Sequence, residues 1–255
     1  MNRILPVFIA LLSCGASVPA SAEPASAALP RLVVSPEPGW PQFRGPRRDG
    51  TCDERGLLAE WPEGGPKKIW SADKIGRGYS SPIIAGGRMF ITGDVGDDER
   101  IFALDLDGRP LWQSKNGAAW KDEYPAARAS VTFSEGRIYH ENAHGRVACF
   151  VAANGQELWA VELLARFGGK NITWGLSECL LVDERAVYAT AGGSEALLVA
   201  LDKKTGAVIW KSAPLRDSEG ERAVENASYA SPILIQHGAQ RLIVGCSLRH
   251  LFCAN

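Results

Sequence analysis

The sequence lacks the features that would point to several common classes of function. Lys and Arg total 28 against 29 Asp and Glu, and no basic block stands out, so we expect no nucleic-acid partner. The one long apolar run, near the N-terminus, is too short to span a membrane. Neither a Gly-x-Ser-x-Gly elbow nor a Gly-rich phosphate loop occurs, so hydrolase and nucleotide-binding functions have no supporting motif.

Cysteine is scarce, and its number does not suit a disulfide framework. The chain has 6 cysteines, one of them Cys14 near the N-terminus, and removal of an export signal would leave an odd number. We therefore expect stability to come mostly from packing of a core. Cys246 and Cys253 could face each other across a hairpin, but burial as small apolar side chains is the favoured interpretation.

The N-terminal residues are typical of an export signal. A weakly basic start, an apolar run over Ile4–Leu12 and the small residues Ala20–Ala22 predict a signal peptide over residues 1–22. An alternative is a lipoprotein box with Cys14 as the lipidated residue. Residues 23–39 are rich in Ala, Pro and Ser and predict a flexible leader. We expect a periplasmic or extracellular protein without a transmembrane segment.

What the sequence does contain is a hairpin pattern that repeats through a folded body at residues 40–255. The clearest copy, Ala200–Trp210, has a Gly-containing turn between two short apolar runs. Tryptophans 70, 112, 159 and 210 are separated by 42, 47 and 51 residues, and each interval holds about four short strands. Glycine precedes the last three tryptophans by four residues each time. This spacing predicts an all-β propeller of four-stranded antiparallel blades rather than a β-sandwich.

The number of blades follows from the same spacing. Residues 40–46 and 61–66 are dense in turn residues and predict extended chain lying on the scaffold. The first strand signal is Lys67–Trp70, which we interpret as the end of a partial blade. Three full blades follow, and a fourth begins near Tyr229 and stops before a closing tryptophan. About four blades are therefore present, and we expect an incomplete propeller whose coding sequence continues.

The best-preserved copy resembles the pyrroloquinoline-quinone-type (PQQ-like) propeller repeat, whose motif is Ala-x-Asp-x-x-Thr-Gly-x-x-x-Trp. The matching residues are Ala200, Asp202, Thr205, Gly206 and Trp210. The opening of the body resembles exported members from planctomycete-like bacteria. In this family the motif is architectural: the tryptophan of one blade packs on its neighbour. The repeat occurs in quinoprotein dehydrogenases and in the propeller lipoprotein of the outer-membrane β-barrel assembly machinery, so the resemblance implies the fold more strongly than the function.

One string matches a catalytic motif. Residues His140–His144 read His-Glu-Asn-Ala-His, the His-Glu-x-x-His pattern of zinc metalloproteases. That mechanism needs a helix, which places both imidazoles on one face. Here the string lies between two strand signals, so we expect a hairpin and no zinc site.

Two further features bear on cofactors. The acidic residues of Asp94–Glu99 could attract calcium but lack EF-hand spacing, and a solvated hairpin tip is the favoured interpretation. A quinone-dependent dehydrogenase of this family would need a calcium and quinone site, commonly beside a pair of adjacent cysteines. The sequence has no Cys-Cys pair, and no calcium ligand or catalytic Asp can be assigned.

The expected function is therefore that of a scaffold. We predict a non-catalytic, exported propeller that binds protein partners through loops at its blade edges, with no assigned catalytic, cofactor-binding or metal-binding residue. The alternative is a fragment of a PQQ-dependent quinoprotein oxidoreductase whose site lies in blades not present. A metalloprotease at residues 140–144 is the third hypothesis.

Overall fold

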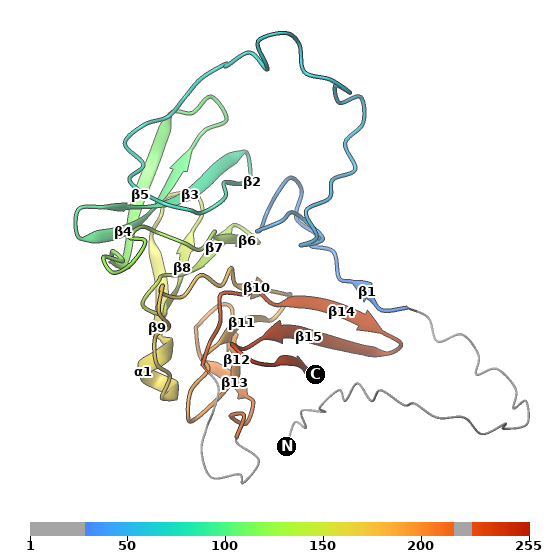
Figure 1. The fold of residues 1–255 in the computed structure, drawn as a ribbon, viewed down its shortest axis with the longest axis vertical. Helices are drawn as coiled ribbons and strands as arrows, with labels where there is room; N and C mark the ends of the chain where they lie inside the picture. Colours follow the sequence, from blue (N-terminus) through green and yellow to red (C-terminus); the bar gives the residue numbers. More distant parts are fainter. Residues whose placement is uncertain (1–28, 217–225) are drawn as a thin grey trace, which may run out of the picture.

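Four antiparallel sheets, each of four strands, make up the protein in a computed structural model that describes residues 29–216 and 226–255 (Figure 1). The predicted signal peptide at 1–22, Cys14 and the first part of the predicted leader lie outside the described residues. None of the described helices has the length and apolar character needed to cross a bilayer.

Each of the first three sheets is one blade, built from four strands that are consecutive in the chain. Blade 1 consists of β2 (Ile83–Ala85), β3 (Arg88–Val95), β4 (Asp98–Leu104) and β5 (Pro110–Ala118). Blade 2 consists of β6 (Thr132–Ser134), β7 (Arg137–Glu141), β8 (Arg146–Val151) and β9 (Glu157–Glu162), followed by the short helix α1 (Leu163–Phe167). Blade 3 consists of β10 (Leu181–Val182), β11 (Ala186–Thr190), β12 (Leu198–Asp202) and β13 (Val208–Lys211). The predicted all-β propeller of four-stranded blades is confirmed.

Blade 4 has a different composition. Its strands β14 (Ile233–His237), β15 (Gln240–Cys246) and β16 (Leu251–Ala254) follow the order of the other blades, but the fourth strand, β1 (Arg31–Leu32), pairs with β14. In blades 1 to 3 that edge, the inner one, carries no further strand. Residues predicted to be flexible leader are thus part of a sheet, and the folded body begins before residue 40. Short two-residue pairing of this kind leaves almost no periodic signal in a sequence.

Neighbouring blades share apolar cores. Side chains from blades 1 and 2 form one cluster, which includes Ile83, Phe90 and Ile138, and blades 2 and 3 share another, which includes Tyr139 and Leu201. A third cluster joins blades 3 and 4. Because both faces of a middle blade are covered in this way, its central strands are apolar on successive residues rather than on alternate ones.

Tryptophan from the outer strand of one blade packs on a glycine in the closing hairpin of the next. A Cβ atom on Gly206 would lie 2.7 Å from Cε3 of Trp159, and one on Gly155 would lie 2.5 Å from Cε3 of Trp112. The indole nitrogens of these tryptophans donate to carbonyl oxygens of the same hairpins, at 3.1 Å to Ala152 for Trp112 and at 3.1 Å to Lys203 for Trp159. The predicted architectural role of the motif is confirmed.

The region of Trp70 differs from the prediction in its secondary structure but agrees with it in the packing of the indole. Lys67–Trp70 forms no strand, so the partial blade predicted there does not exist in this structure. The indole nevertheless docks as expected, because a Cβ on Gly108 would lie 2.6 Å from its Cε3. A strand needs a neighbour for its backbone hydrogen bonds, and the chain that leads to Trp70 runs as a long arc away from the sheets before it returns to blade 1 (Figure 1).

Residues 31–48, which we call the hub segment, contact the inner strands of all four blades. Val33 N donates to Leu234 O of blade 4 at 2.9 Å, and Trp40 N donates to Ile84 O of blade 1 at 2.7 Å. Phe133 N of blade 2 donates to Pro41 O at 2.8 Å. The hub segment therefore satisfies backbone groups that the inner strands would otherwise leave unpaired. Residues 40–46 lie on the scaffold as predicted, but mostly as turns rather than extended chain. Residues 61–66, predicted to do the same, are almost entirely exposed, with Trp61 71% exposed, which corrects that part of the prediction.

Arg48 makes the contact between the hub segment and blade 3. Its guanidinium is buried and donates to Cys179 O at 2.6 Å and to Leu180 O at 3.2 Å. A third bond reaches Gln42 Oε1 at 3.1 Å. Burial lowers the pKa of the guanidinium from its usual value, but three hydrogen bonds hold its position.

The five described cysteines are all free thiols. Cys149 and Cys179 are buried, as expected for small apolar side chains. Cys246 is exposed, which corrects the expectation of burial for that residue. It pairs in register with Leu251, while Cys253 pairs with Val244, so the two thiols do not face each other.

Substitution at the docking glycine tests how much the indole contact stabilises the fold. Gly206 and Gly136 share a φ of 72°, but a Cβ on Gly136 meets no atom within 4 Å. Both Ala variants carry the strain of a left-handed backbone, so their difference isolates the displaced indole. We expect Gly206→Ala to lose about 1–3 kcal/mol more unfolding free energy than Gly136→Ala in urea titrations. Equal losses would contradict the docking role.

Substitution of Arg48 tests the hub contact. Arg48→Met leaves the carbonyl oxygen of Cys179 buried without the Arg48 donor, while Leu180 O keeps only the bond from Thr132 Oγ1, so we expect a loss of about 1–3 kcal/mol in unfolding free energy. Arg47→Met is the matched control, because Arg47 bonds only to nearby surface groups such as Thr51 and Asp53, and we expect it to lose less than about 1 kcal/mol. A loss of the same size in both variants would refute the contact.

Candidate binding site

The string His140–His144 forms the predicted hairpin. His140 lies in β7, and Asn142 to Gly145 make the turn to β8, closed by a bond of 2.9 Å from Gly145 N to Asn142 O. His140 is fully buried, whereas His144 packs on the ring of Trp120 at 5.3 Å. The helical spacing that a zinc protease requires is replaced by a strand and a turn. Within the described residues no three His, Cys, Asp or Glu side chains are grouped as metal ligands.

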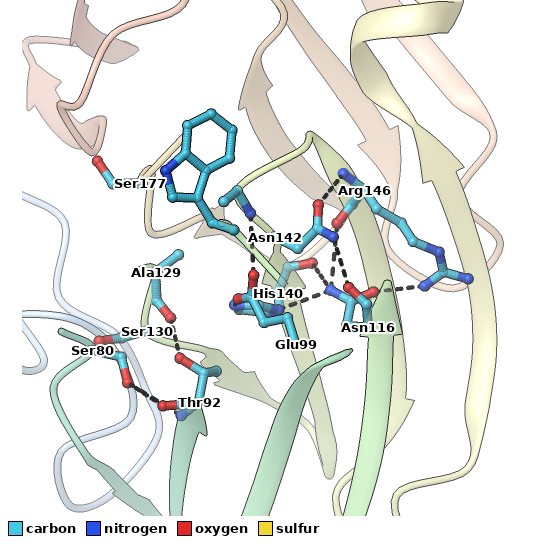
Figure 2. A network of polar contacts seen from close by, with 12 residues as sticks. Ser80, Thr92, Glu99, Asn116, Ala129, Ser130, His140, Asn142, Arg146 and Ser177 are labelled. Atoms are coloured by element: carbon cyan, nitrogen blue, oxygen red, sulfur yellow. Dashed lines mark hydrogen bonds and ion pairs between the residues drawn. The ribbon is translucent and has the colours of Figure 1, made fainter. Parts of the chain in front are cut away.

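A buried polar network surrounds His140 and joins blade 1 to blade 2 (Figure 2). Asn116 of β5 donates from Nδ2 to His140 Nδ1 at 2.8 Å and receives a bond of 2.6 Å at Oδ1 from Arg146. Asn142 donates to the Asn116 carbonyl oxygen at 2.8 Å. Because the amide nitrogen only donates, the imidazole proton lies on Nε2, which faces Glu99 Oε1 at 3.3 Å. These bonds position the hairpin rather than a substrate.

The acids in and near this network are buried, and burial disfavours their charged forms. Burial raises the pKa of Glu99 to about 8 and that of Glu178 to about 7, and it raises the pKa of Glu141 well above its usual value. Burial also lowers the pKa of His140 to about 4, so its contact with Glu99 joins two neutral groups. Residues 95–97 are the exposed tip predicted for the acidic cluster, but Glu99 is buried, which corrects that part of the prediction.

An open cleft lies where the inner strands of all four blades begin. It has a volume of about 450 Å³. Ser81, Ser130, Cys179 and Ser231 line it from equivalent positions of the four repeats. Each of the first three donates its backbone N–H to the side chain of the next: Ser81 to Ser130 at 2.8 Å, Ser130 to Cys179 at 3.2 Å and Cys179 to Ser231 at 2.9 Å. This relay holds the cleft wall in place.

The cleft has an uneven charge. Three arginines line it, Arg44 and Arg48 from the hub segment and Arg128 from the segment before β6, and no Asp or Glu does. The hydroxyl groups of the serines add neutral polar groups. A cleft of this composition attracts anionic groups.

An aromatic rim continues the cleft toward solvent. It consists only of Tyr, Trp and Arg, and its four aromatic side chains are between 37% and 64% exposed. Trp174 lies 5.4 Å from the ring of Tyr229 and 6.0 Å from that of Tyr124. The rim residues are Tyr79, Tyr124, Arg128, Trp174 and Tyr229.

Contacts below the rim connect it to the buried network. The guanidinium carbon of Arg128 lies 5.7 Å from the ring centre of Tyr79 and 5.8 Å from that of Trp120. Trp120 in turn packs on His144. His144, the last residue of the His140–His144 string, therefore supports the rim from beneath, because Trp120 packs on it.

No site residue was predicted from the sequence, so the residues of the cleft and of the rim were not identified there. A signal was present: Tyr79 and Tyr229 each stand two residues before the Ser-Pro-Ile of the first and fourth copies. Arg128 and Ser177 occupy the same offset before Ser130 and Cys179. These positions are about fifty residues apart, so only alignment of the repeats by their inner strands would have grouped them.

The buried carboxyl of Glu99 predicts a pH dependence of stability. Between pH 4.5 and about 8 the unfolded chain loses the Glu99 proton while the folded chain keeps it, so its raised pKa makes stability fall as pH rises. We expect Glu99→Gln to reduce this fall by about 1.4 kcal/mol per pH unit in urea titrations. Glu162→Gln, at a side chain that is 63% exposed, is the control and should leave the slope unchanged. Parallel curves for Glu99→Gln and the parent protein would contradict the prediction.

Comparison with known proteins gives the family. A sequence profile described as outer membrane protein assembly factor BamB matches residues 51–192 and 97–247. The chain is 26% identical to the outer membrane protein assembly factor BamB of Alkalilimnicola ehrlichii over 140 residues, which are 53% of this chain and 32% of that protein. It is 27% identical to the quinohemoprotein alcohol dehydrogenase ADH-IIG of Pseudomonas putida over 140 residues, which are 52% of this chain and 19% of that protein.

Solved structures of the same kind are similar. The chain matches the structure of BamB from Moraxella catarrhalis with a TM-score of 0.44 and 19% identity, covering 73% of this chain and 54% of that one. It thus spans only part of the length of these relatives. The two profile matches together extend over more than half of the sequence and coincide with the blades. The chain therefore belongs to the BamB-type family of PQQ-like β-propellers.

Proposed function

We propose that the chain is a non-catalytic, exported propeller scaffold that binds a protein partner at the aromatic rim and the cleft. The observation that carries the proposal is the composition of the rim, which contains only Tyr, Trp and Arg. These residue types dominate the binding energy of protein interfaces, because they combine large contact areas with few rotatable bonds. An exposed aromatic group of this size on a globular surface is typical of an interaction site.

The relatives support a role in binding. One of them is named as an assembly factor of the outer membrane, a function that requires contacts with other proteins. The predicted signal peptide at residues 1–22 supports export to the same compartment. The rim and cleft are formed by segments that precede the inner strands, which is where loops carry function on a rigid scaffold.

A quinoprotein oxidoreductase is the second candidate, and similarity to a quinohemoprotein alcohol dehydrogenase supports it. The arginines of the cleft suit the carboxylates of a quinone. Calcium needs hard oxygen ligands, usually carboxylates, and the cleft lining contains no Asp or Glu. The residues that line the cleft therefore do not fit a calcium and quinone pair, and we favour the scaffold.

Photo-cross-linking in cells tests the scaffold function. With benzoylphenylalanine at Tyr124, 64% exposed in the rim, we expect discrete adducts with one or a few proteins. The same group at Leu111, 47% exposed on β5, is the control and should give none of them. Truncation of a central aromatic side chain costs about 2 kcal/mol or more, so Trp174→Ala should reduce the adducts at least about tenfold.

Two outcomes would contradict the proposal. Adducts of the same identity and yield at Leu111 and Tyr124 would show that the rim is not the contact surface. Dye-linked alcohol oxidation by the purified protein on addition of pyrroloquinoline quinone and calcium would favour the oxidoreductase.

A further inference from the structure

We infer that the cleft receives an acidic, extended segment of the partner, with its carboxylates against the arginines and its aromatic or proline side chains on the rim. The inference rests on the proposed protein-binding function and adds the chemistry of the partner. It depends on the charge of the cleft, the way the cations are held, and the continuity of cleft and rim.

The cations of the cleft are hydrogen-bonded to neutral oxygens, although Glu178 lies near Arg48, and Asp94 near Arg128, at longer range. Arg44 donates to the backbone oxygen of Asp49 at 2.9 Å, and Arg128 donates to the backbone oxygen of Glu123 at 3.1 Å. Arg48 is likewise bonded to neutral oxygens. In the part of the chain that the structure describes, the ion pairs include none of these three arginines.

Some arginines elsewhere on the surface do form ion pairs. Arg100, Arg146 and Arg241 each approach an Asp or Glu side chain within 3.0 Å. The chain as a whole is nearly neutral, with 28 basic and 29 acidic residues. The cleft itself combines three arginines with a lining that contains no Asp or Glu, so an incoming carboxylate would meet complementary charge there.

The cations are also held in place before a ligand arrives. Arg48 is only 6% exposed and is fixed by its three hydrogen bonds. Arg128 is placed between the rings of Tyr79 and Trp120, and its Nε is buried without a hydrogen-bond partner. A carboxylate that entered the cleft would therefore meet a guanidinium group that is already positioned by the two rings.

The shape favours an extended chain over a compact ion. Cleft and rim share Tyr79, Arg128 and Tyr229, so the charged and aromatic surfaces are continuous. The cleft alone has about 450 Å³, and the rim adds an open depression of about 320 Å³. A small anion would leave the aromatic part uncovered. An extended peptide that carries both acidic and aromatic side chains would cover both parts, because it can reach along the continuous surface.

Fluorescence anisotropy with synthetic peptides tests the inference. The probe is a short fluorescein-labelled peptide in which aspartate and tyrosine alternate, and the matched probe has asparagine for every aspartate. We expect the aspartate peptide to bind at least about tenfold more tightly, and added salt to weaken only that peptide. Arg44→Gln and Arg128→Gln should each weaken it about five- to tenfold, whereas Arg109→Gln, at a side chain that is 74% exposed on the hairpin between β4 and β5, should not.

Arg44 is exposed, so its variant should fold normally, and urea titrations check both variants. Equal affinity for the aspartate and asparagine peptides would overturn the inference, while the adducts at Tyr124 would still support the proposed function. Three further results would overturn the inference. They are equal weakening of peptide binding by Arg109→Gln, no measurable binding of the aspartate peptide, and tighter binding of a single-stranded oligonucleotide of the same charge. Loss of the Tyr124 adducts with retained peptide selectivity would instead count against the cellular function alone.

Discussion

The contact between an indole and a glycine is the interaction on which the rest of the structure depends. A blade has two apolar faces and cannot cover either of them alone, so it needs a neighbour in a defined position. Trp112 and Trp159 provide that position, because each lies on a glycine of the next blade and bonds to the carbonyl of the same hairpin. Any side chain at these glycines would occupy the space of the indole. The spacing of the blades follows from this contact.

The hub segment performs a second function that depends on this spacing. Once the blades are arranged, their inner strands present backbone groups to one central region, and residues 31–48 bond to all four. The same segment brings Arg44 and Arg48 to the mouth of the cleft. The binding site is thus assembled from the hub segment and from the first residues of each blade, and the elements that close the centre of the fold also supply its charge.

The polar groups of this protein divide into two sets with opposite roles. His140 lies in a string that resembles a zinc-protease motif and Glu99 in an acidic cluster, but burial keeps both neutral and their hydrogen bonds join blade 1 to blade 2 (Figure 2). Arg44 and Arg128 have no motif around them, yet they line an open cleft. Access to water decides whether a polar group stabilises the fold or can bind a ligand. The hairpin between β7 and β8 buries its polar groups, whereas the cleft at the start of the inner strands is open.

The class of fold could be predicted from the sequence, because the tryptophan and glycine spacing is a local property of each repeat and a propeller consists of such repeats stacked side by side. The sequence also placed His140–His144 in a hairpin. It did not determine that Lys67–Trp70 lacks a strand or that Arg31–Leu32 forms one, since both depend on which sheet edges lie nearby. Only the tertiary structure decided the site: Tyr79, Arg128 and Tyr229 are far apart in the chain and meet because the blades surround one centre.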